Sequence, residues 1–225
     1  MLVPRRLLEL GHLLPVPEGL PLETAALTEP LACVLNSLET CRLKAGGSLL
    51  IVGGGPMGLM HLALARLLGA ATVLVSEPDG ERAAWARRLG ANLVLDPARD
   101  DLIRKTLEAT DGAGADAVVV TAGLPEVVPL ALDAVRRQGV VSLFGGFPPG
   151  TSTPLDPNAI HYGELVLTGS QNASIDQYRR ALLLLSRLPR LAETVTDRFP
   201  MSEAARAYEV RLAGRGLKSM VLPQE

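Results

Sequence analysis

A run of glycines, Gly53-Gly54-Gly55-Pro56-Met57-Gly58, follows a short apolar segment (48–52) and opens a segment of helical pattern (56–69). Without a side chain, Gly53 permits a tight turn, and Gly55 lets the backbone come close to a phosphate. Gly58 allows the helix to pack closely on the preceding strand. The first N–H groups of a helix have no internal acceptor and can bind phosphate oxygens. The pattern therefore predicts a dinucleotide site.

An acidic residue, Glu77, stands directly after the next apolar segment (72–76), about twenty residues beyond the glycines. A carboxylate in this position accepts hydrogen bonds from the ribose hydroxyls of adenosine. It would also repel a 2′-phosphate, which favours NAD over NADP. Arg82 is close enough in sequence to touch the ribose or to soften this discrimination. The alternative for Glu77 is a solvated residue at the end of a strand.

The elements that must position these residues follow from an alternation of short β-branched runs and longer helical patterns. The pattern predicts strands at 48–52, 72–76, 93–95, 116–120, 139–143 and 165–168, with an irregular, Pro-rich connection before the last strand. It predicts helices at 56–69, 80–89, 100–110 and 124–135. Apolar strands separated by helices indicate a parallel sheet covered on both faces. We expect an α/β fold, a Rossmann-type doubly wound six-stranded sheet in the order 3-2-1-4-5-6.

Small residues follow the fourth and fifth predicted strands. In such a sheet the nucleotide lies across the carboxyl ends of the strands. The residues after these two strands are therefore expected beside it, and small ones let the backbone make contact. The alternative is that the glycines serve only their turns. The residues are Thr121, Ala122, Gly123, Phe144, Gly145 and Gly146.

The flanks of the chain differ from this core. We divide the chain into a junction segment and helix (1–43), the nucleotide-binding core (44–170), and a C-terminal helix with the remnant of a second sheet (171–225). The first part has a strand-like stretch at 12–16 and a helix at 22–41 interrupted at Pro30. The last part has a helix at 175–188, a strand at 194–199, a helix at 202–212 capped by Ser202, and a strand at 217–222. These strands do not fit the six-strand count.

Composition narrows the function. With 48% hydrophobic and 20% charged residues, the chain can bury a core, and its net charge of −2 argues against a nucleic-acid partner. No stretch approaches the apolar length of a membrane span, and Met1–Leu10 lacks the core of a signal peptide. Cys33 and Cys41 are spaced too widely for a metal knuckle, and reduced thiols suit the cytoplasm. The histidines, His12, His61 and His161, are scattered.

With these residues placed, the chain resembles the medium-chain dehydrogenase/reductase superfamily, and within it the zinc-type polyol, threonine and alcohol dehydrogenases. The resemblance covers essentially the whole chain, in order. Zinc-free quinone reductases match less well, because their loops usually carry Ala-Ala-Gly-Gly-Val-Gly. The motifs that carry the resemblance are Ala-Ala-Leu-Thr-Glu-Pro-Leu (25–31), the glycine loop, Val-Ser-Glu-Pro (75–78), Arg-Leu-Gly-Ala (88–91), Leu-Phe-Gly-Gly (143–146), His-Tyr-Gly-Glu-Leu (161–165), Leu-Thr-Gly-Ser (167–170) and Asp-Arg-Phe-Pro (197–200).

The resemblance implies backbone contacts to NAD from the whole loop, including Pro56 and Met57. It implies nicotinamide contacts near Thr121, Phe144 and Thr168, with Ala122 and Gly145 beside them. Lys218 matches a basic position that reaches the pyrophosphate in some members, although a solvated surface lysine explains it equally well. Family dimers often join the sixth strands edge to edge, which implies a homodimer through 165–168.

In the resembled family an N-terminal β-rich domain binds the catalytic zinc through a Cys and a Gly-His-Glu motif. Zinc holds the substrate oxygen and stabilises the alkoxide that precedes hydride transfer. We expect this chain to lack most of that domain, and therefore to hold no zinc itself. Glu29, in the Glu-Pro-Leu motif, can only be a neighbour of such a site, because one carboxylate cannot bind catalytic zinc alone. The strands and segments left from that domain are expected to expose apolar surface.

Two functions remain open. The first is the NAD-binding portion of a zinc-type alcohol or polyol dehydrogenase, which oxidises a secondary alcohol to a ketone and is not catalytic alone. The second is a stand-alone NAD(H)-binding module, or one subunit of a split dehydrogenase. A short-chain dehydrogenase is rejected, because neither Tyr162, Tyr178 nor Tyr208 is followed by a lysine four residues later.

Overall fold

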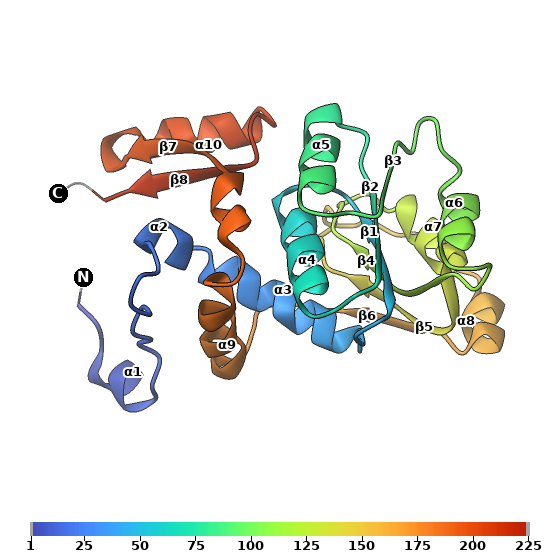
Figure 1. The fold of residues 1–225 in the computed structure, drawn as a ribbon, viewed down its shortest axis with the longest axis horizontal. Coiled ribbons are helices and arrows are strands. Elements are labelled where there is room, and N and C mark those ends of the chain that lie inside the picture. The colour runs from blue at the N-terminus through green and yellow to red at the C-terminus, as the bar shows by residue number, and fades with distance from the viewer. Residues whose placement is uncertain (1, 224–225) are drawn as a thin grey trace.

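The computed structural model describes residues 2–223 and contains a six-stranded parallel sheet (Figure 1). Its strands are β1 (Ser48–Val52), β2 (Thr72–Ser76), β3 (Leu93–Leu95), β4 (Ala115–Val120), β5 (Val135–Leu143) and β6 (Val166–Gly169). They lie in the order β3-β2-β1-β4-β5-β6. The predicted order and the Rossmann fold are therefore confirmed. The order reverses between β1 and β4, and this is where such sheets bind ligands.

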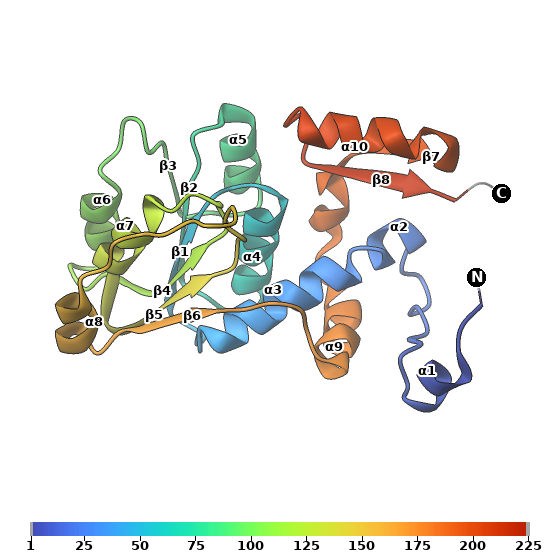
Figure 2. The same ribbon diagram turned by 180° about the vertical axis from the view of Figure 1, so that it is seen from behind.

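Helices cover both faces of the sheet. One face carries α3 (Thr28–Thr40), α4 (Pro56–Leu67), α5 (Gly80–Arg88) and α9 (Ile175–Leu185). The other carries α6 (Leu102–Ala109), α7 (Val127–Ala134) and α8 (Pro157–Gly163). Figure 2 shows the sheet between these two groups. Strand residues are apolar on both sides because both faces are buried.

A smaller unit follows the sheet. β7 (Val195–Pro200) and β8 (Lys218–Leu222) form a parallel pair, and α10 (Ala204–Leu212) packs on both strands. This pair is separate from the six-stranded sheet, as the strand count predicted. The core of the α3 face nevertheless continues through Leu191, Val195 and Leu217. The parts predicted at the two ends of the chain therefore share one core with the nucleotide-binding region.

The N-terminal part consists of α1 (Arg5–Glu9), an extended stretch and α2 (Leu22–Ala25). It lies on the same side of the molecule as the β7–β8 pair (Figure 1). Helix α1 buries none of its residues. Large apolar side chains are exposed here, as we expected of this region, and they are Leu2, Leu7, Leu8, Leu10, Leu13, Val16 and Leu22.

Four local predictions were wrong. Residues 12–16 form no strand. The helix predicted at 22–41 breaks after Ala25, and Pro30 sits inside the first turn of α3, where a missing N–H costs nothing. Ser202 does not cap α10, because a 3₁₀ turn places Glu203 at that position instead. The connection expected to be irregular contains α8, which begins at Asp156 and Pro157, a strong start signal.

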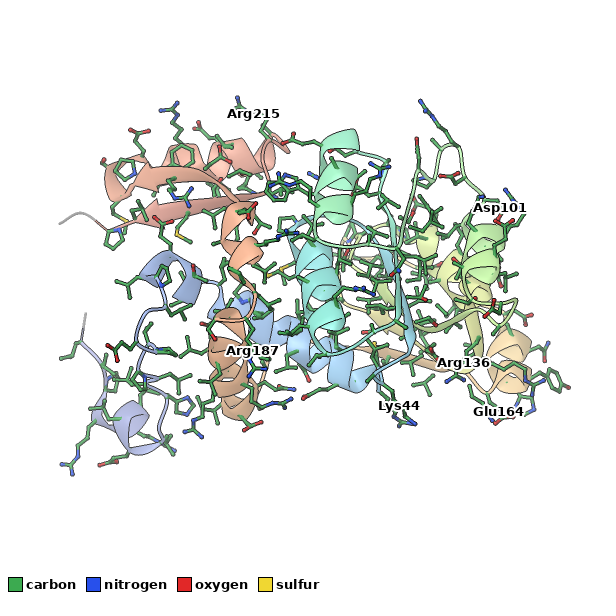
Figure 3. All side chains as sticks on the ribbon, in the orientation of Figure 1. Lys44, Asp101, Arg136, Glu164, Arg187 and Arg215 are labelled. Carbon is green, nitrogen blue, oxygen red and sulfur yellow. The ribbon has the colours of Figure 1, made fainter. Side chains whose placement is uncertain are left out.

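An ion pair holds the amino ends of the central strands. The Asp116 carboxylate accepts hydrogen bonds from the Ser48 N–H (2.7 Å), the Ser48 hydroxyl (2.9 Å) and the Arg136 Nε (2.6 Å). Arg136 is labelled in Figure 3. Burial alone would raise the pKa of Asp116, but these donors together hold it below its ordinary value.

Within residues 2–223, no helix is both long and apolar enough to cross a bilayer.

Candidate functional site

A cavity of about 570 Å³ lies at the carboxyl ends of β1, β2 and β4, where the fold predicts a ligand. It is lined by residues from the glycine loop and from the loops after β2, β3 and β4. Nine of the cofactor-contact residues proposed from sequence meet here. They are Gly53, Gly55, Pro56, Met57, Gly58, Glu77, Arg82, Thr121 and Ala122.

Gly53, Gly58 and Gly55 each lack a side chain for a different structural reason. Gly53 has a φ of 109°, a conformation that side chains rarely adopt. A Cβ on Gly58 would collide with the Gly53 carbonyl, so helix and loop can only meet this closely at a glycine. A Cβ on Gly55 would meet no protein atom within 4 Å. The space beside Gly55 is therefore open to a ligand.

The helix that follows the loop has no side-chain cap. Gly55 is its N-cap residue, and Pro56 stands in its first turn. The neighbouring helices α5 and α6 are capped by Asp79 and by Asp101, which Figure 3 labels. Only α4 of these three presents its amino end to the cavity without a carboxylate on it. Free N–H groups and the positive end of the helix dipole favour a phosphate there.

Glu77 lines the cavity but is only 5% exposed. Its Oε2 accepts a hydrogen bond from the Gly54 N–H at 2.7 Å, and its Oε1 accepts one from the Asp79 N–H at 2.9 Å. A carboxylate offers about four acceptor positions, so two backbone donors leave room for a ribose hydroxyl. The sequence offers no separate reason for a glycine at position 54. The structure shows that it is glycine because Glu77 lies against it.

Thr121 supports the loop from the end of β4. Its hydroxyl donates to the Gly53 carbonyl at 2.8 Å and lies 3.1 Å from the Val52 carbonyl. A Cβ on Gly53 would lie 2.5 Å from that hydroxyl oxygen. The side chain therefore fixes the loop, while Thr121 still lines the cavity.

An apolar wall of the cavity was not predicted from the sequence. It comes from the loop after β3, the start of α6 and the segment leading into α7. Such a wall suits a flat heteroaromatic ring, which is stabilised by burial and needs few hydrogen bonds. The signal was available, because these segments also begin at the carboxyl edge of the sheet. The residues are Pro97, Leu102, Ile103, Leu124, Val127 and Leu130.

Six residues that were expected beside the nucleotide do not line this cavity, and they are Gly123, Phe144, Gly145, Gly146, Thr168 and Lys218. Phe144 packs edge-on against His61, with ring centroids 4.6 Å apart, and Gly145 lies against the Thr121 carbonyl. Thr168 is in β6, two strands beyond β4. Lys218 is half-buried in β8. Burial lowers its pKa, Glu29 opposes that effect, and Arg211 adds to it. The nicotinamide and pyrophosphate roles of these residues stay predictions.

His61 packs in the core rather than in the cavity. It is fully buried in α4, and its Nδ1 lies 2.8 Å from the Met57 carbonyl. Burial lowers its pKa to about 4, and the bond to Met57 opposes this only in part. The ring is therefore neutral near pH 7, with Nδ1 donating to the Met57 carbonyl.

Glu29 is exposed in the first turn of α3 and accepts a hydrogen bond from the Cys33 thiol at 3.3 Å. Burial, then the Glu29 hydrogen bond and charge, raise the pKa of Cys33 to about 11. Among residues 2–223, no three His, Cys, Asp or Glu side chains are grouped to hold a metal ion. The described residues therefore do not provide the three or four ligands that zinc takes in proteins.

Comparison with known proteins agrees with this geometry. The family model described as zinc-binding dehydrogenase matches residues 56–187. The chain is 31% identical over 213 residues to a D-arabitol-phosphate dehydrogenase of Enterococcus avium, covering 93% of this chain and 60% of that protein. It is 32% identical over 202 residues to an L-threonine 3-dehydrogenase of Pyrococcus furiosus, covering 88% and 58%.

Solved structures agree as well. An alcohol dehydrogenase of Thermotoga maritima matches with a TM-score of 0.89 at 25% identity, covering 94% of this chain and 60% of that one. A zinc-binding dehydrogenase of Sinorhizobium meliloti, bound to NADP, matches with a TM-score of 0.82 at 28% identity, covering 93% and 61%. The chain thus spans about 60% of the length of these relatives. The chain belongs to the zinc-binding dehydrogenase family.

Proposed function

We propose that this chain binds NAD(H) in the cavity at the carboxyl ends of β1, β2 and β4. The observation that carries the proposal is the open space beside Gly55 at the uncapped start of α4. This is the place where a backbone without side chains can approach two linked phosphates. Glu77 then faces the adenosine ribose, and the apolar wall at Ile103 and Val127 takes the adenine ring.

The same arrangement favours NAD over NADP. A 2′-phosphate would come close to the Glu77 carboxylate, whose position is set by two backbone hydrogen bonds. The negative charges of the phosphate and of the carboxylate would repel each other strongly in a partly buried site. Arg82 also lines the cavity and would moderate this repulsion. The NADP-bound relative from Sinorhizobium meliloti makes the choice worth measuring.

For the whole reaction we propose a zinc-type alcohol or polyol dehydrogenase, which oxidises a secondary alcohol to a ketone. Bound NAD would supply the hydride acceptor. The residues of this chain would bind and orient it, with the loop on the phosphates and the apolar wall excluding water from the adenine. We derive no step through zinc, because the described residues do not group its ligands. We therefore propose that the chain is not catalytic alone and needs a separate source of the zinc-binding residues.

Isothermal titration of the chain with NAD, NADH and NADP tests this proposal. We expect NAD and NADH to bind and NADP to bind at least about tenfold more weakly, a difference of about 1.4 kcal/mol. No binding of any of them to the folded chain would contradict it. Assays with secondary alcohols, NAD and added zinc test whether the chain is catalytic alone. Robust turnover by this chain would contradict the proposal that it needs zinc-binding residues from a separate source.

A stand-alone NAD(H)-binding module, or a subunit of a split dehydrogenase, is the second candidate. The grouping of cofactor residues without a metal-ligand group in residues 2–223 favours it. Restored alcohol oxidation on adding a separate protein that carries Cys and Gly-His-Glu zinc ligands would support a split enzyme.

Both cysteines are free, which suits a reducing compartment such as the cytoplasm.

We further propose a homodimer through the edge of the large sheet. Within residues 2–223, β6 pairs only with β5, and its outer edge includes the exposed Val166. An apolar edge strand is a template for pairing with a second copy. Analytical ultracentrifugation should show a dimer, and V166K should shift it to monomer. A monomeric wild-type chain at micromolar concentration would contradict this part.

A further inference from the structure

We propose that Glu77 is a positioning residue, which holds the glycine loop ready for the two phosphates before any ligand is present. This goes beyond contact with the ribose, and it rests on the proposed function for the identity of the ligand. The carboxylate would act on the phosphates through Gly54, without touching them. Glu77 thus has a role in the empty protein that can be measured there.

Within residues 2–223, the hydrogen bonds of the Glu77 N–H and carboxylate are all with backbone atoms. Its own N–H donates to the Leu95 carbonyl at 2.9 Å, which fixes its main chain at the edge of the sheet. Its carboxylate accepts from the Gly54 N–H at 2.7 Å in a buried position. The second oxygen accepts from the Asp79 N–H at 2.9 Å. Hydrogen bonds to a charged acceptor are the stronger kind, and here one carboxylate accepts two of them from backbone N–H groups outside regular structure.

The loop needs an external restraint. Three consecutive glycines, 53–55, lose more conformational freedom on ordering than any other three residues would. Both backbone polar groups of Gly53 are hydrogen-bonded, because its N–H donates to the Ser76 carbonyl at 2.9 Å and its carbonyl accepts from Thr121. For Gly54, the side-chain partner within residues 2–223 is Glu77. Removing that bond frees the loop one residue before Gly55.

The packing supports the same conclusion. A Cβ on Gly54 would lie 2.9 Å from the Glu77 Cβ and 3.2 Å from its Oε2. A side chain there would push the carboxylate away. Gly54 is therefore matched to Glu77, whereas Gly55, the next residue, faces open space. Gly54 therefore donates to the Glu77 carboxylate, and Gly55 leaves room for the ligand.

The second hydrogen bond extends the restraint to α5. Asp79 receives it on its N–H and uses its own carboxylate to cap α5, accepting from the Arg82 N–H at 2.9 Å. Arg82 lines the cavity. One carboxylate therefore links the loop that binds phosphate with the helix that carries Arg82.

Glutamine at position 77 separates this role from ribose binding. An amide has one accepting and one donating end, so one end would face a backbone N–H that also donates. The restraint on Gly54 or on Asp79 would be lost, although the size of the side chain is unchanged. A glutamine can still hydrogen-bond a ribose hydroxyl. Glu77→Gln should therefore loosen the glycine loop in the ligand-free chain. Loss of a ribose contact alone would not have this effect.

The experiment measures amide hydrogen exchange by NMR on the ligand-free chain, with Glu81→Gln as control. Glu81 is exposed in the first turn of α5 and belongs to no part of the cavity. We expect E77Q to lose protection at the Gly54 amide, the Asp79 amide or both by about tenfold, the value of one such bond. Leu50 in β1 should keep its protection. E81Q should match wild type throughout.

A second arm titrates inorganic pyrophosphate, which can reach the loop but has no ribose. We expect its affinity to fall at least about fivefold in E77Q and to stay unchanged in E81Q. If E77Q loses NAD affinity but keeps pyrophosphate affinity and the protection of both amides, Glu77 is a ribose contact only and the proposal is overturned. If E77Q does not fold, Glu77→Asp replaces it, since the shorter side chain cannot span both donors.

The two arms also separate this proposal from the function it rests on. Should wild type bind neither NAD nor pyrophosphate, the proposed function fails. The exchange arm still decides whether Glu77 holds the loop, because it uses no ligand. Protection lost in E77Q then supports the restraint alone, and protection retained at both amides overturns it.

Discussion

The carbonyl oxygen of Gly53 occupies the place that a Cβ on Gly58 would take. The first turn of α4 can therefore close onto the loop only while position 58 has no side chain. We expect Gly58→Ala to lower the free energy of unfolding by about 3 kcal/mol or more, because backbone must move to relieve the collision. Urea unfolding measures this change.

Gly80 provides the control for that substitution. It begins α5, and a Cβ there would meet no atom within 4 Å. Gly80→Ala should leave stability within about 0.5 kcal/mol of wild type or raise it slightly. Equal stability of the two alanine variants would show that the close approach of Gly53 and Gly58 does not constrain the fold.

His61 should make stability depend on pH. Its pKa in the folded chain is about 4, because burial disfavours the charged ring, whereas the ordinary histidine value of 6.5 applies to the unfolded chain. Between these values the unfolded chain binds the proton more readily. This contribution to stability is complete above pH 6.5, falls as the pH is lowered to 4, and amounts to about 3 kcal/mol.

His61→Met removes that titration and fills a similar volume. The Met57 carbonyl keeps the helical hydrogen bond from the backbone N–H of residue 61. The difference in unfolding free energy between wild type and H61M should therefore shift in favour of the variant as the pH falls from 7 to 4. Parallel pH profiles would contradict the neutral, buried histidine.

The thiol of Cys33 should react slowly with alkylating agents, since only the thiolate is nucleophilic. Its pKa of about 11 comes from burial first and from Glu29 second. Glu29→Gln removes the second cause, so we expect several-fold faster alkylation of Cys33 by iodoacetamide at pH 8.5, followed by mass spectrometry.

Cys41 is an internal control for this measurement. Its pKa is also raised to about 11 by burial, but Glu29 plays no part. Its alkylation rate should be the same in wild type and in E29Q. Acceleration of both thiols would indicate general loosening of the fold, and acceleration of neither would contradict the coupling of Cys33 to Glu29.

The sequence predicted the parts of the site that depend on residue type alone. Gly53, Gly55 and Gly58 were recognised because the absence of a side chain is a property of the residue. The strand order followed from the alternation of elements and the handedness of crossovers. Gly54 was not understood, because its reason lies in Glu77, 23 residues away, and in the direction of that side chain.

Other features depended on packing that a single sequence does not show. The apolar wall joins Leu102 and Ile103 to Leu124 and Val127, which meet only once the strands are ordered. Phe144 follows β5 as predicted, but its ring packs in the core against His61, outside the cavity. The break in the helix predicted at 22–41 was placed at Pro30 because proline usually ends a helix. In the structure Pro30 lies in the first turn of α3, where proline needs no break.

Binding of NAD to wild type and to Gly55→Ala tests whether the cavity beside Gly55 holds the dinucleotide. Gly55 has a φ of −66°, which alanine adopts freely, and its Cβ would enter only the open cavity. In isothermal titration we expect wild type to bind NAD and G55A to bind it at least about tenfold more weakly, with its melting temperature within about 2 °C of wild type. Equal affinity in both proteins, or no binding of NAD to folded wild type, would contradict the assignment of this cavity to the dinucleotide.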